Sequence, residues 1–266
     1  MNHNDILGVT MAGLEAGFKV SHIAAFDLEV CAPDVSVNSV LSDQGLLDFD
    51  HIPVKEGSRI VGMLERGSLN HAGTVRHRMR RLDGEMLVSA EQPLPKFLPT
   101  LAESPYRLVV QGANIEGIVT LSDVAKLPVR LLAFTSVAHL EAVLTEVIRR
   151  KYPHDDEAWL MFLDKEQRNE VAGRLKGRKK QNIHLLSSIE VAGFRHKLTA
   201  VGKLQQLTKL EKDRESIVTF RNSLAHDGDF VKECKGVEGL LERLSLVQHW
   251  IDALKYDESD MGTTNA

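Results

Sequence analysis

Two segments of the sequence repeat one order of apolar run, glycine-containing turn and apolar run. The first spans residues 52–64 and the second spans residues 106–120. Short apolar runs separated by such turns predict β-hairpins. Gly62 and Gly117 close the two hairpins and are 55 residues apart. This spacing predicts an internal duplication, which restricts the N-terminal half to a tandem α+β arrangement.

Further elements surround the two hairpins. After the apolar run at residues 86–88, residues 93–101 are compatible with a helix. Residues 5–17 are compatible with a short helix, whereas residues 23–30 fit a strand or a helix equally well. Pro128 follows the second copy and predicts a domain boundary.

The second copy ends in Gly117-Ile118-Val119-Thr120-Leu121-Ser122-Asp123. This stretch resembles the Gly-x-x-Thr/Ser-x-x-Asp motif of CBS (cystathionine β-synthase-type) domains, which bind adenine nucleotides. The resemblance implies that Thr120 contacts phosphate and that Asp123 contacts the ribose hydroxyls of AMP, ADP or ATP. Thr-x-x-Asp is also a helix capping box, which accounts for both residues without a ligand. Both interpretations remain open from the sequence.

The first copy departs from this motif. Glu65 stands at the position of Thr120, and Ser68 stands at the position of Asp123. Because a carboxylate repels phosphate, we expect at most one nucleotide site of this type in the pair. Between the copies lies a cationic run that we interpret as a solvated face or as a holder of ligand phosphates: Arg76, His77, Arg78, Arg80 and Arg81.

The C-terminal half is predicted to be helical. Apolar residues recur at helical spacing in residues 134–152, 158–175 and 198–225, and a last helix is predicted at about residues 236–255. Residues 257–266 predict a disordered tail. The second of these helices ends in a cationic cluster dense enough to attract a polyanion or to form a solvated helix end: Arg174, Lys176, Arg178, Lys179 and Lys180.

Charge is distributed unevenly along the chain, whose net charge is −4. Residues 1–131 contain 12 Lys and Arg against 16 Asp and Glu, whereas residues 132–266 contain 21 of each. The second half therefore accommodates a local basic patch. Two cysteines without a Cys-x-x-Cys pair favour a reducing cytoplasm, and no membrane span, signal peptide or metal site is predicted.

Unlike polar groups gather where the third predicted helix stops. Asn222 and His226 are four residues apart and share a helix face, and the long side chain of Arg221 reaches the same patch. Gly228 predicts the helix end, where the C-terminal dipole favours an imidazolium. Arginine, amide and imidazole suit phosphodiester chemistry. The alternative is an ordinary helix end in which Arg221 pairs with Asp227 or Asp229.

This Arg-Asn-x-x-x-His motif resembles that of HEPN domains, a helical family that includes metal-independent ribonucleases. The resemblance covers roughly residues 132–256, and its first long helix bears Glu141. It implies that His226 acts as general acid or base, that Arg221 stabilises the transition state, and that Asn222 orients the imidazole or the phosphate. It also implies a homodimer with a composite active site, and membership of a toxin or phage-defence system.

The expected protein is α+β, with a tandem βαβ CBS pair at residues 1–130 and a HEPN-like all-α bundle at residues 131–256. We expect a cytoplasmic, nucleotide-regulated endoribonuclease that requires no metal or other cofactor for catalysis. Its expected partners are RNA and an adenine nucleotide, and neither a membrane nor DNA. The alternative is a non-catalytic nucleotide-sensing module that dimerises or binds a protein or RNA partner.

Overall fold

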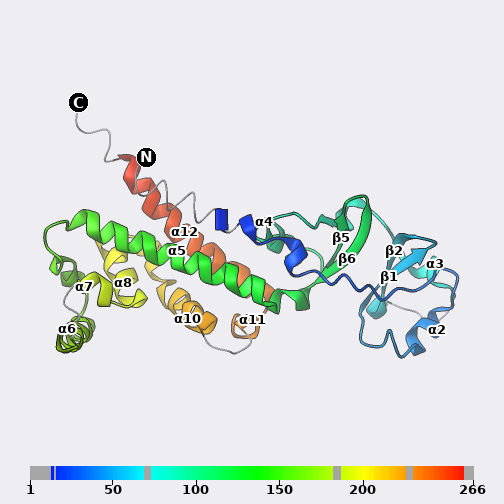
Figure 1. Cartoon of the computed structure of the whole chain (residues 1–266), viewed down its shortest axis with the longest axis horizontal. Helices are drawn as coiled ribbons and strands as arrows, with labels where there is room; N and C mark the ends of the chain where they lie inside the picture. The colour runs from blue at the N-terminus through cyan, green and yellow to red at the C-terminus, as the bar shows by residue number, and fades with distance from the viewer. Residues whose placement is uncertain (1–12, 15, 69–72, 182–186, 226–229, 261–266) are drawn as a thin grey trace. The chain divides into compact units, whose positions relative to one another are not determined.

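The computed structural model of the chain describes residues 13–14, 16–68, 73–181, 187–225 and 230–260. It divides into an N-terminal unit, Gly13–Val129, and a C-terminal unit whose described part begins at Arg130. The division lies beside Pro128. Strands are confined to the N-terminal unit in the described residues, and long helices form the C-terminal unit (Figure 1).

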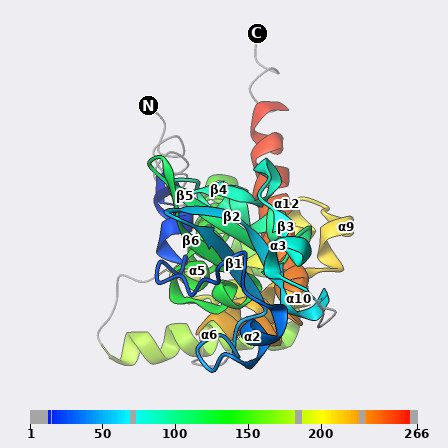
Figure 2. The same ribbon diagram turned by 90° about the vertical axis from the view of Figure 1, so that its right-hand side faces the viewer.

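The N-terminal unit contains two three-stranded sheets, β1-β2-β3 and β4-β5-β6. Their strands are β1 His51–Glu56, β2 Arg59–Glu65, β3 Arg80–Arg81, β4 Leu87–Ser89, β5 Tyr106–Gln111 and β6 Asn114–Thr120. β1–β2 and β5–β6 are the two predicted antiparallel hairpins, and β4 pairs with β5 in parallel. The sheets meet where β2 contacts β6 (Figures 1 and 2).

The strand register confirms the predicted duplication. His51 pairs with Glu65 in the first hairpin, and Tyr106 pairs with Thr120 in the second. The pairing register shifts close to the tip of both hairpins, between Val54 and Lys55 in β1 and between Val109 and Val110 in β5. Gly57 and Gly112 have φ of 59° and 64°, the left-handed conformation that a tight hairpin turn requires. Each of these positions in the first hairpin has its equivalent 55 residues later in the second, as Gly62 has Gly117.

The lead-in belongs to the repeat as well. Ala25 forms an antiparallel bridge with Ile118 on the outer edge of β6. Arg80 of β3 pairs in the same way with Met63 of β2, and Ala25 and Arg80 are 55 residues apart. Residues 23–30, for which strand and helix both fitted, thus form an extended connection with one bridge. Cys31 then forms a parallel bridge with Val54 of β1, as β4 pairs in parallel with β5. Each copy therefore has the order βαββ: a short extended segment, a helix and a hairpin.

Short helices complete the N-terminal unit. They are α2 Val37–Ser42, α3 Val75–Arg78 and α4 Leu94–Phe97, with 3₁₀ turns at Val20–His22, Arg66–Ser68, Gly84–Met86, Leu98–Ala102 and Leu121–Ala125. The predicted helix at residues 93–101 is therefore one α-turn followed by a 3₁₀ turn. Buried side chains from both hairpins form the core, including Ile52, Val54, Met63, Leu64, Leu108 and Val109.

Every element described in the C-terminal unit is helical. The helices are α5 Leu127–Lys151, α6 Lys165–Lys180, α7 Ser188–Val191, α8 Phe194–Leu204, α9 Thr208–Glu211, α10 Arg214–Ala225, α11 Phe230–Glu233 and α12 Val237–Asp260, with a 3₁₀ turn at Ala158–Phe162. α10 packs against α8 and α12. The largest buried side chains of this unit are Trp159, Trp250, Phe220 and Phe230.

Two predicted helices are interrupted by local capping. The helix predicted at residues 158–175 begins only at Lys165, because Asp164 accepts a hydrogen bond from the Gln167 amide as an N-cap (2.8 Å). The helix predicted at residues 198–225 breaks after α8, where Gln206 has φ of 52°. The amide of Leu207 donates to the Gly202 carbonyl there, the long-range hydrogen bond of a Schellman helix end.

The first and last long helices extend beyond their predicted ranges. α5 begins at Leu127, because Pro128 in a first turn has no amide hydrogen bond to lose. By length and composition α5 passes as a membrane-spanning helix (mean hydropathy 1.6), yet Leu140, Leu144 and Ile148 are buried in this unit. α12 continues to Asp260, which is four residues into the predicted tail; residues 261–266 lie outside the described residues.

Candidate functional site

The nucleotide motif lies at the carboxyl end of β6, where the chain turns into a 3₁₀ turn. The Asp123 carboxylate accepts hydrogen bonds from the Thr120 amide (2.6 Å) and from the Thr120 hydroxyl (3.0 Å). The Thr120 hydroxyl also lies 2.8 Å from that of Ser122. The motif thus performs the capping role that the sequence allowed, and its side chains hold one another in place.

A lysine that the sequence analysis did not single out completes this cluster. Lys126 Nζ lies 2.7 Å from the other Asp123 carboxylate oxygen and donates to the Ile23 carbonyl (2.6 Å). Asp123 is buried, whereas about two fifths of the Lys126 side chain is exposed. Hydroxyl, carboxylate and ammonium therefore meet at one strand end. The three-residue spacing of Asp123 and Lys126 is the signal that would have predicted this ion pair.

The equivalent end of the first hairpin has different chemistry. Tyr106 donates its hydroxyl to Glu65 Oε1 (3.2 Å), and its ring lies against His51 with centroids 4.7 Å apart. Burial raises the pKa of Tyr106 to about 12, so the phenol stays protonated and able to donate. Burial likewise lowers the pKa of His51, which favours a neutral ring. A carboxylate, an imidazole and a phenol therefore occupy this end of the first hairpin.

Two arginines of the cationic run between the copies are engaged by acids. Arg76 pairs with Asp34 (2.9 Å) and with Glu56 (2.6 Å), and Arg80 pairs with Asp83 (3.0 Å). The carboxylates of Asp34 and Glu56 thus compete with any phosphate for Arg76. These contacts favour the interpretation of the run as a structured, solvated face. They tie helix α3 to the first hairpin and to the segment before α2.

In the C-terminal unit, Arg221 and Asn222 lie in the last turns of α10. Arg221 is half-buried, Asn222 is exposed, and the guanidinium lies 3.4 Å from the amide oxygen of Asn222. Within the described residues Arg221 forms no ion pair. His226, Asp227 and Asp229 lie outside the described residues, so the predicted site is described only for its arginine and its asparagine.

A second arginine contacts the same helix end. Arg130, near the start of α5, donates from Nε to the Leu224 carbonyl (3.0 Å). A cation at a helix C-terminus is favoured by the carbonyl dipoles there. Arg130 therefore anchors the end of the helix that carries Arg221 and Asn222. Sequence analysis missed this contact because 94 residues separate the partners.

Glu141, which the HEPN resemblance singled out on the first long helix, has a partner on α8. Its carboxylate lies 3.1 Å from Lys197 Nζ, and Lys197 is buried while about a third of the Glu141 side chain is exposed. Beside this pair, His196 lies 3.0 Å from Glu170 of α6. The contacts of Glu141 in this structure link α5 to α8.

Because the Lys197 ammonium depends on Glu141, we expect Glu141→Ala to lower the free energy of unfolding by about 2 kcal/mol. This is less than the roughly 3–5 kcal/mol for breaking a fully buried pair, because Glu141 is partly exposed. Tryptophan fluorescence in a urea titration measures it, since both tryptophans lie in this unit. Lys197→Met combined with Glu141→Ala should recover most of the loss. Equal stabilities of Glu141→Ala and wild type would contradict this role.

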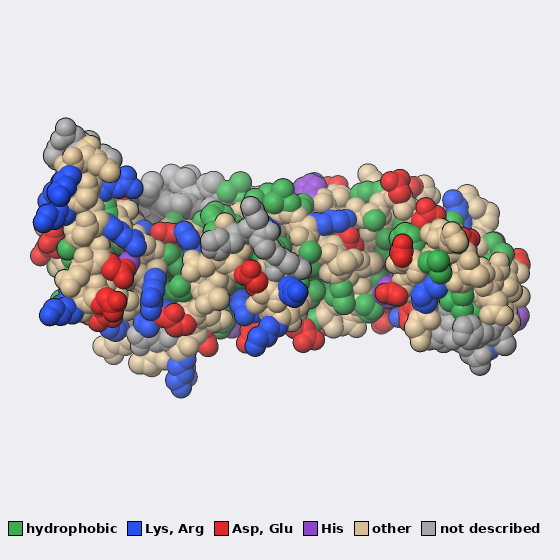
Figure 3. Space-filling view, turned by 90° about the horizontal axis from the view of Figure 1, so that it is seen from below, with side chains coloured by type: hydrophobic (Ala, Val, Ile, Leu, Met, Phe, Trp, Pro, Cys, Tyr) green, Lys and Arg blue, Asp and Glu red, His purple; other side chains and the backbone are tan. Residues whose placement is uncertain are grey.

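The cationic end of α6 is open to solvent. Arg174, Lys176, Arg178, Lys179 and Lys180 are all exposed, and Figure 3 shows basic side chains along this helix. Arg174 donates to the Val191 carbonyl (3.4 Å), and with Arg178 it lines a recess of about 580 Å³ that also contains Glu190. Arg149 lies 3.5 Å from Glu190 and partly neutralises it. This surface attracts anions.

No protein-family model and no curated protein matches the sequence. Several solved structures of CBS domains match the N-terminal part. The CBS domain of a bacterial CNNM/CorC-family Mg²⁺ transporter in complex with ATP has 17% identity and a TM-score of 0.37, over 46% of this chain and 94% of that chain. CBSX2 in complex with AMP has 19% identity and a TM-score of 0.38, over 43% and 98%.

A hemolysin-like protein containing a CBS domain, from Oenococcus oeni, has 15% identity and a TM-score of 0.35, over 44% of this chain and 93% of that chain. At such low scores these likenesses carry no conclusion about ligand or activity. The duplicated βαββ topology and the contacts of Thr120, Asp123 and Lys126 are therefore the basis for a functional proposal. The HEPN-type resemblance of the C-terminal unit stays a prediction.

Proposed function

We propose that the protein is a nucleotide-sensing regulator. The N-terminal unit binds one adenine nucleotide at Thr120 and Asp123, and the C-terminal unit passes the bound state on to a protein or RNA partner. The observation that carries this proposal is the cluster at the end of β6, where the hydroxyl of Thr120, the carboxylate of Asp123 and the ammonium of Lys126 meet. Hydroxyl and ammonium suit phosphate, and a carboxylate suits the ribose hydroxyls.

The contacts of Asp123 indicate how a nucleotide would enter. An ionised carboxylate offers about four acceptor positions, and three are used by Thr120 N–H, Thr120 O–H and Lys126. One position remains for a ribose hydroxyl. Lys126 is the partner that is free to move, because it is partly exposed. We therefore propose that Lys126 turns from Asp123 to the phosphate when the nucleotide binds, which frees a second acceptor position for the ribose.

The asymmetry of the repeat supports a single site in each chain. Glu65 occupies the place of Thr120 in the first copy and accepts a hydrogen bond from Tyr106. Its negative charge opposes a phosphate at that end, because like charges brought together in a partly desolvated site cost several kcal/mol. A stoichiometry of about one nucleotide per chain follows from this difference.

Titration calorimetry with AMP, ADP and ATP tests the nucleotide site on wild type and on Thr120→Val. This substitution removes the hydroxyl but keeps the branched shape and the amide that donates to Asp123. We expect affinity to fall about tenfold or more, the usual scale for losing one hydrogen bond to a charged group. Thr135→Val makes the same change on α5, outside the N-terminal unit, where the hydroxyl only donates to the Leu131 carbonyl of its own helix; this matched control should bind normally. Equal binding by Thr120→Val, or no binding by wild type, would exclude the site.

A second candidate function is the metal-independent ribonuclease. The observation that favours it is the position of Arg221 and Asn222 side by side near the end of α10, with no described carboxylate paired to Arg221. A guanidinium in this position is available to a phosphodiester. The exposed cations of α6, from Arg174 to Lys180, are the proposed contact for the RNA backbone. His226 completes this proposal as the acid–base residue.

The assembly and location of the protein are also proposals. We propose a homodimer, because a HEPN-type composite site pairs two motif-bearing helices across a subunit interface. We propose a cytoplasmic location, which is consistent with two free, buried cysteines, Cys31 and Cys234. Membership of a toxin or defence system rests on the family resemblance.

A further inference from the structure

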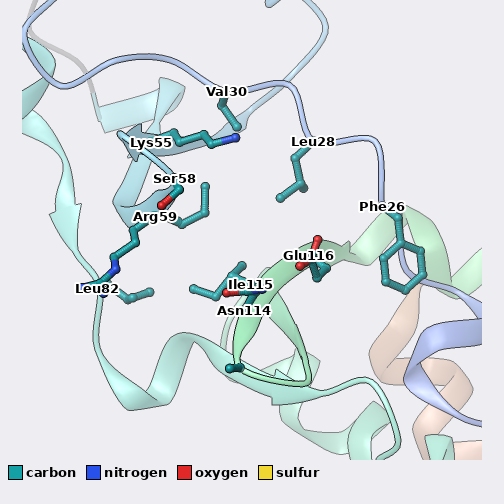
Figure 4. Close-up of a pocket in the computed structure, with 12 residues that line it drawn as sticks. Phe26, Leu28, Val30, Lys55, Ser58, Arg59, Leu82, Asn114, Ile115 and Glu116 are labelled. Carbon is teal, nitrogen blue, oxygen red and sulfur yellow. The ribbon is translucent and has the colours of Figure 1, made fainter.

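A cavity of the N-terminal unit lies at the hairpin tips, whereas the proposed nucleotide cluster lies at the other end of β6. Its volume is about 860 Å³, and both tips line it together with Leu82 and the connection at residues 26–30. Figure 4 shows the tips of β1–β2 and β5–β6 on two sides of this space and the connection passing along a third. Cavities of roughly 300–1,000 Å³ are the size of small-molecule sites.

The connection presents an apolar side to the cavity. Phe26, Leu28 and Val30 alternate along it and line the cavity, whereas Asp27 and Glu29 between them are exposed and do not. Ile60, Leu82 and Ile115 add apolar surface from the other walls. Phe26 is 41% exposed, and Leu28 and Val30 are only partly buried. These side chains therefore have apolar surface that no described residue covers.

The backbone of the connection between Ala25 and Cys31 has few hydrogen bonds to the described part of the chain. Bridges hold it at both ends, at Ala25 to Ile118 and at Cys31 to Val54, yet no backbone–backbone hydrogen bond joins residues 26–30 to another described residue. Such a segment adjusts its distance from the hairpin tips at little cost, because few contacts must be broken.

The charges of the cavity are placed asymmetrically. Lys55 and Arg59 come from the first hairpin, where the register irregularity at Val54/Lys55 lies, and neither forms an ion pair with a described carboxylate. Their equivalents in the second hairpin are the neutral Val110 and Asn114. The opposite wall contributes one acid, Glu116. In Figure 4 the Lys55 ammonium extends toward Val30, and Glu116 lies across the cavity on β6.

We infer that this cavity is a binding site for a small organic anion with an aromatic or aliphatic body. The body would lie against Phe26, Leu28 and Ile115, and the phosphate or carboxylate would lie at the Lys55 ammonium. Arg59, whose side chain extends toward Leu82 in Figure 4, adds a second positive charge to the cavity. A charge-assisted hydrogen bond from Lys55 holds the anionic end, and the apolar wall supplies affinity for the body. This site is separate from the proposed nucleotide site and does not depend on it.

Three naphthalene compounds test both halves of the proposal. They share one ring system, and 2-naphthyl phosphate and 2-naphthoate carry the anion that 2-naphthol lacks. In titrations followed by protein NMR, we expect both anions to bind the full chain about tenfold or more tighter than 2-naphthol. Their shift changes should fall on the amides of residues 26–30, 55–60 and 113–116. Changes confined to other residues, or no saturable binding of either anion, would overturn the proposal.

Charge variants separate this site from a nonspecific apolar patch. Lys55→Ala combined with Arg59→Ala should weaken both anions about tenfold or more and leave 2-naphthol within about twofold. Glu116→Gln should strengthen both anions, because it removes the opposing charge. Lys96→Ala, an exposed cation on α4 outside the cavity, is the matched control and should change nothing. Thr120→Val should bind 2-naphthyl phosphate normally, and its failure to do so would place the anion at the nucleotide cluster instead.

Discussion

Replacing Gly62 with alanine is expected to lower the free energy of unfolding of the N-terminal unit by about 3 kcal/mol, at the upper end of the usual cost of overpacking. A Cβ atom at this position would lie 2.4 Å from the Arg80 carbonyl oxygen and 3.1 Å from Met79 Sδ. The carbonyl belongs to β3, which pairs with β2 at this point. β3 must therefore move away or the pairing must be lost.

Gly117→Ala should have a similar but smaller effect. Its Cβ would lie 2.8 Å from the Ala25 carbonyl oxygen and 3.1 Å from the Phe26 ring. The segment at Ala25 pairs with β6 there as β3 pairs with β2. Both glycines therefore allow the backbone of a third segment to lie close to the hairpin. Because the Ala25 connection has few other contacts, it yields more easily, and we expect about 2 kcal/mol.

Hydrogen–deuterium exchange of peptides covering residues 51–65 and 106–120 measures both effects within the full chain. Gly84→Ala is the control, since no heavy atom lies within 4 Å of its new Cβ, and it should change stability by less than about 0.5 kcal/mol. Tryptophan fluorescence reports the C-terminal unit separately. Exchange in Gly62→Ala that equals exchange in Gly84→Ala would contradict the close approach of β3.

Arg221→Ala is the substitution with the largest expected effect on catalysis, if the C-terminal unit cuts RNA. Loss of a charged contact made in the transition state should lower the cleavage rate about a hundredfold or more, and His226→Ala should do the same. Cleavage should continue in EDTA and leave 2′,3′-cyclic phosphate ends, because the attacking oxygen is the RNA 2′-hydroxyl. DNA should remain intact.

Lys209→Ala, an exposed cation on α9, is the control for a general loss of positive charge and should cut normally. Arg221→Lys distinguishes a forked contact from a simple charge, because lysine keeps the charge but not the paired donors. Folded Arg221→Ala protein that cuts RNA at the wild-type rate would exclude the catalytic role. Absence of cleavage by wild type on any RNA tested would leave the regulator as the function of this unit.

The sequence predicted the hairpins, their duplication and the helical second half because these features have local causes. Alternating apolar residues and turn glycines act over a few neighbours, and Gly57 and Gly112 indeed carry the positive φ of their turns. Pairing between segments far apart in the sequence could not be predicted from such local patterns. The bridge of Ala25 to Ile118 joins residues 93 positions apart and has no local pattern of its own.

Helix ends were predicted less well than helix periodicity. The apolar spacing continues through Asp164 and Gln206, but a side-chain cap and a left-handed residue interrupt the backbone at these points. The candidate sites show the same division. Thr120 and Asp123 could be found by motif, and the ion pair of Asp123 with Lys126 could have been found from its three-residue spacing. The contacts of Tyr106 with Glu65 and of Arg130 with the Leu224 carbonyl join residues far apart in the sequence and are known only from the folded chain.

Communication between the units is the central claim of the regulator, and hydrogen–deuterium exchange with and without saturating AMP tests it most directly. A ligand changes the C-terminal unit only through different affinities for the states of the whole chain. In wild type we predict protection of residues 118–126 together with altered exchange in at least one of α5, α8, α10 and α12. At the same AMP concentration both changes should be smaller in Thr120→Val, in proportion to its lower occupancy. Protection of residues 118–126 with unaltered exchange throughout residues 130–260 would contradict the claim.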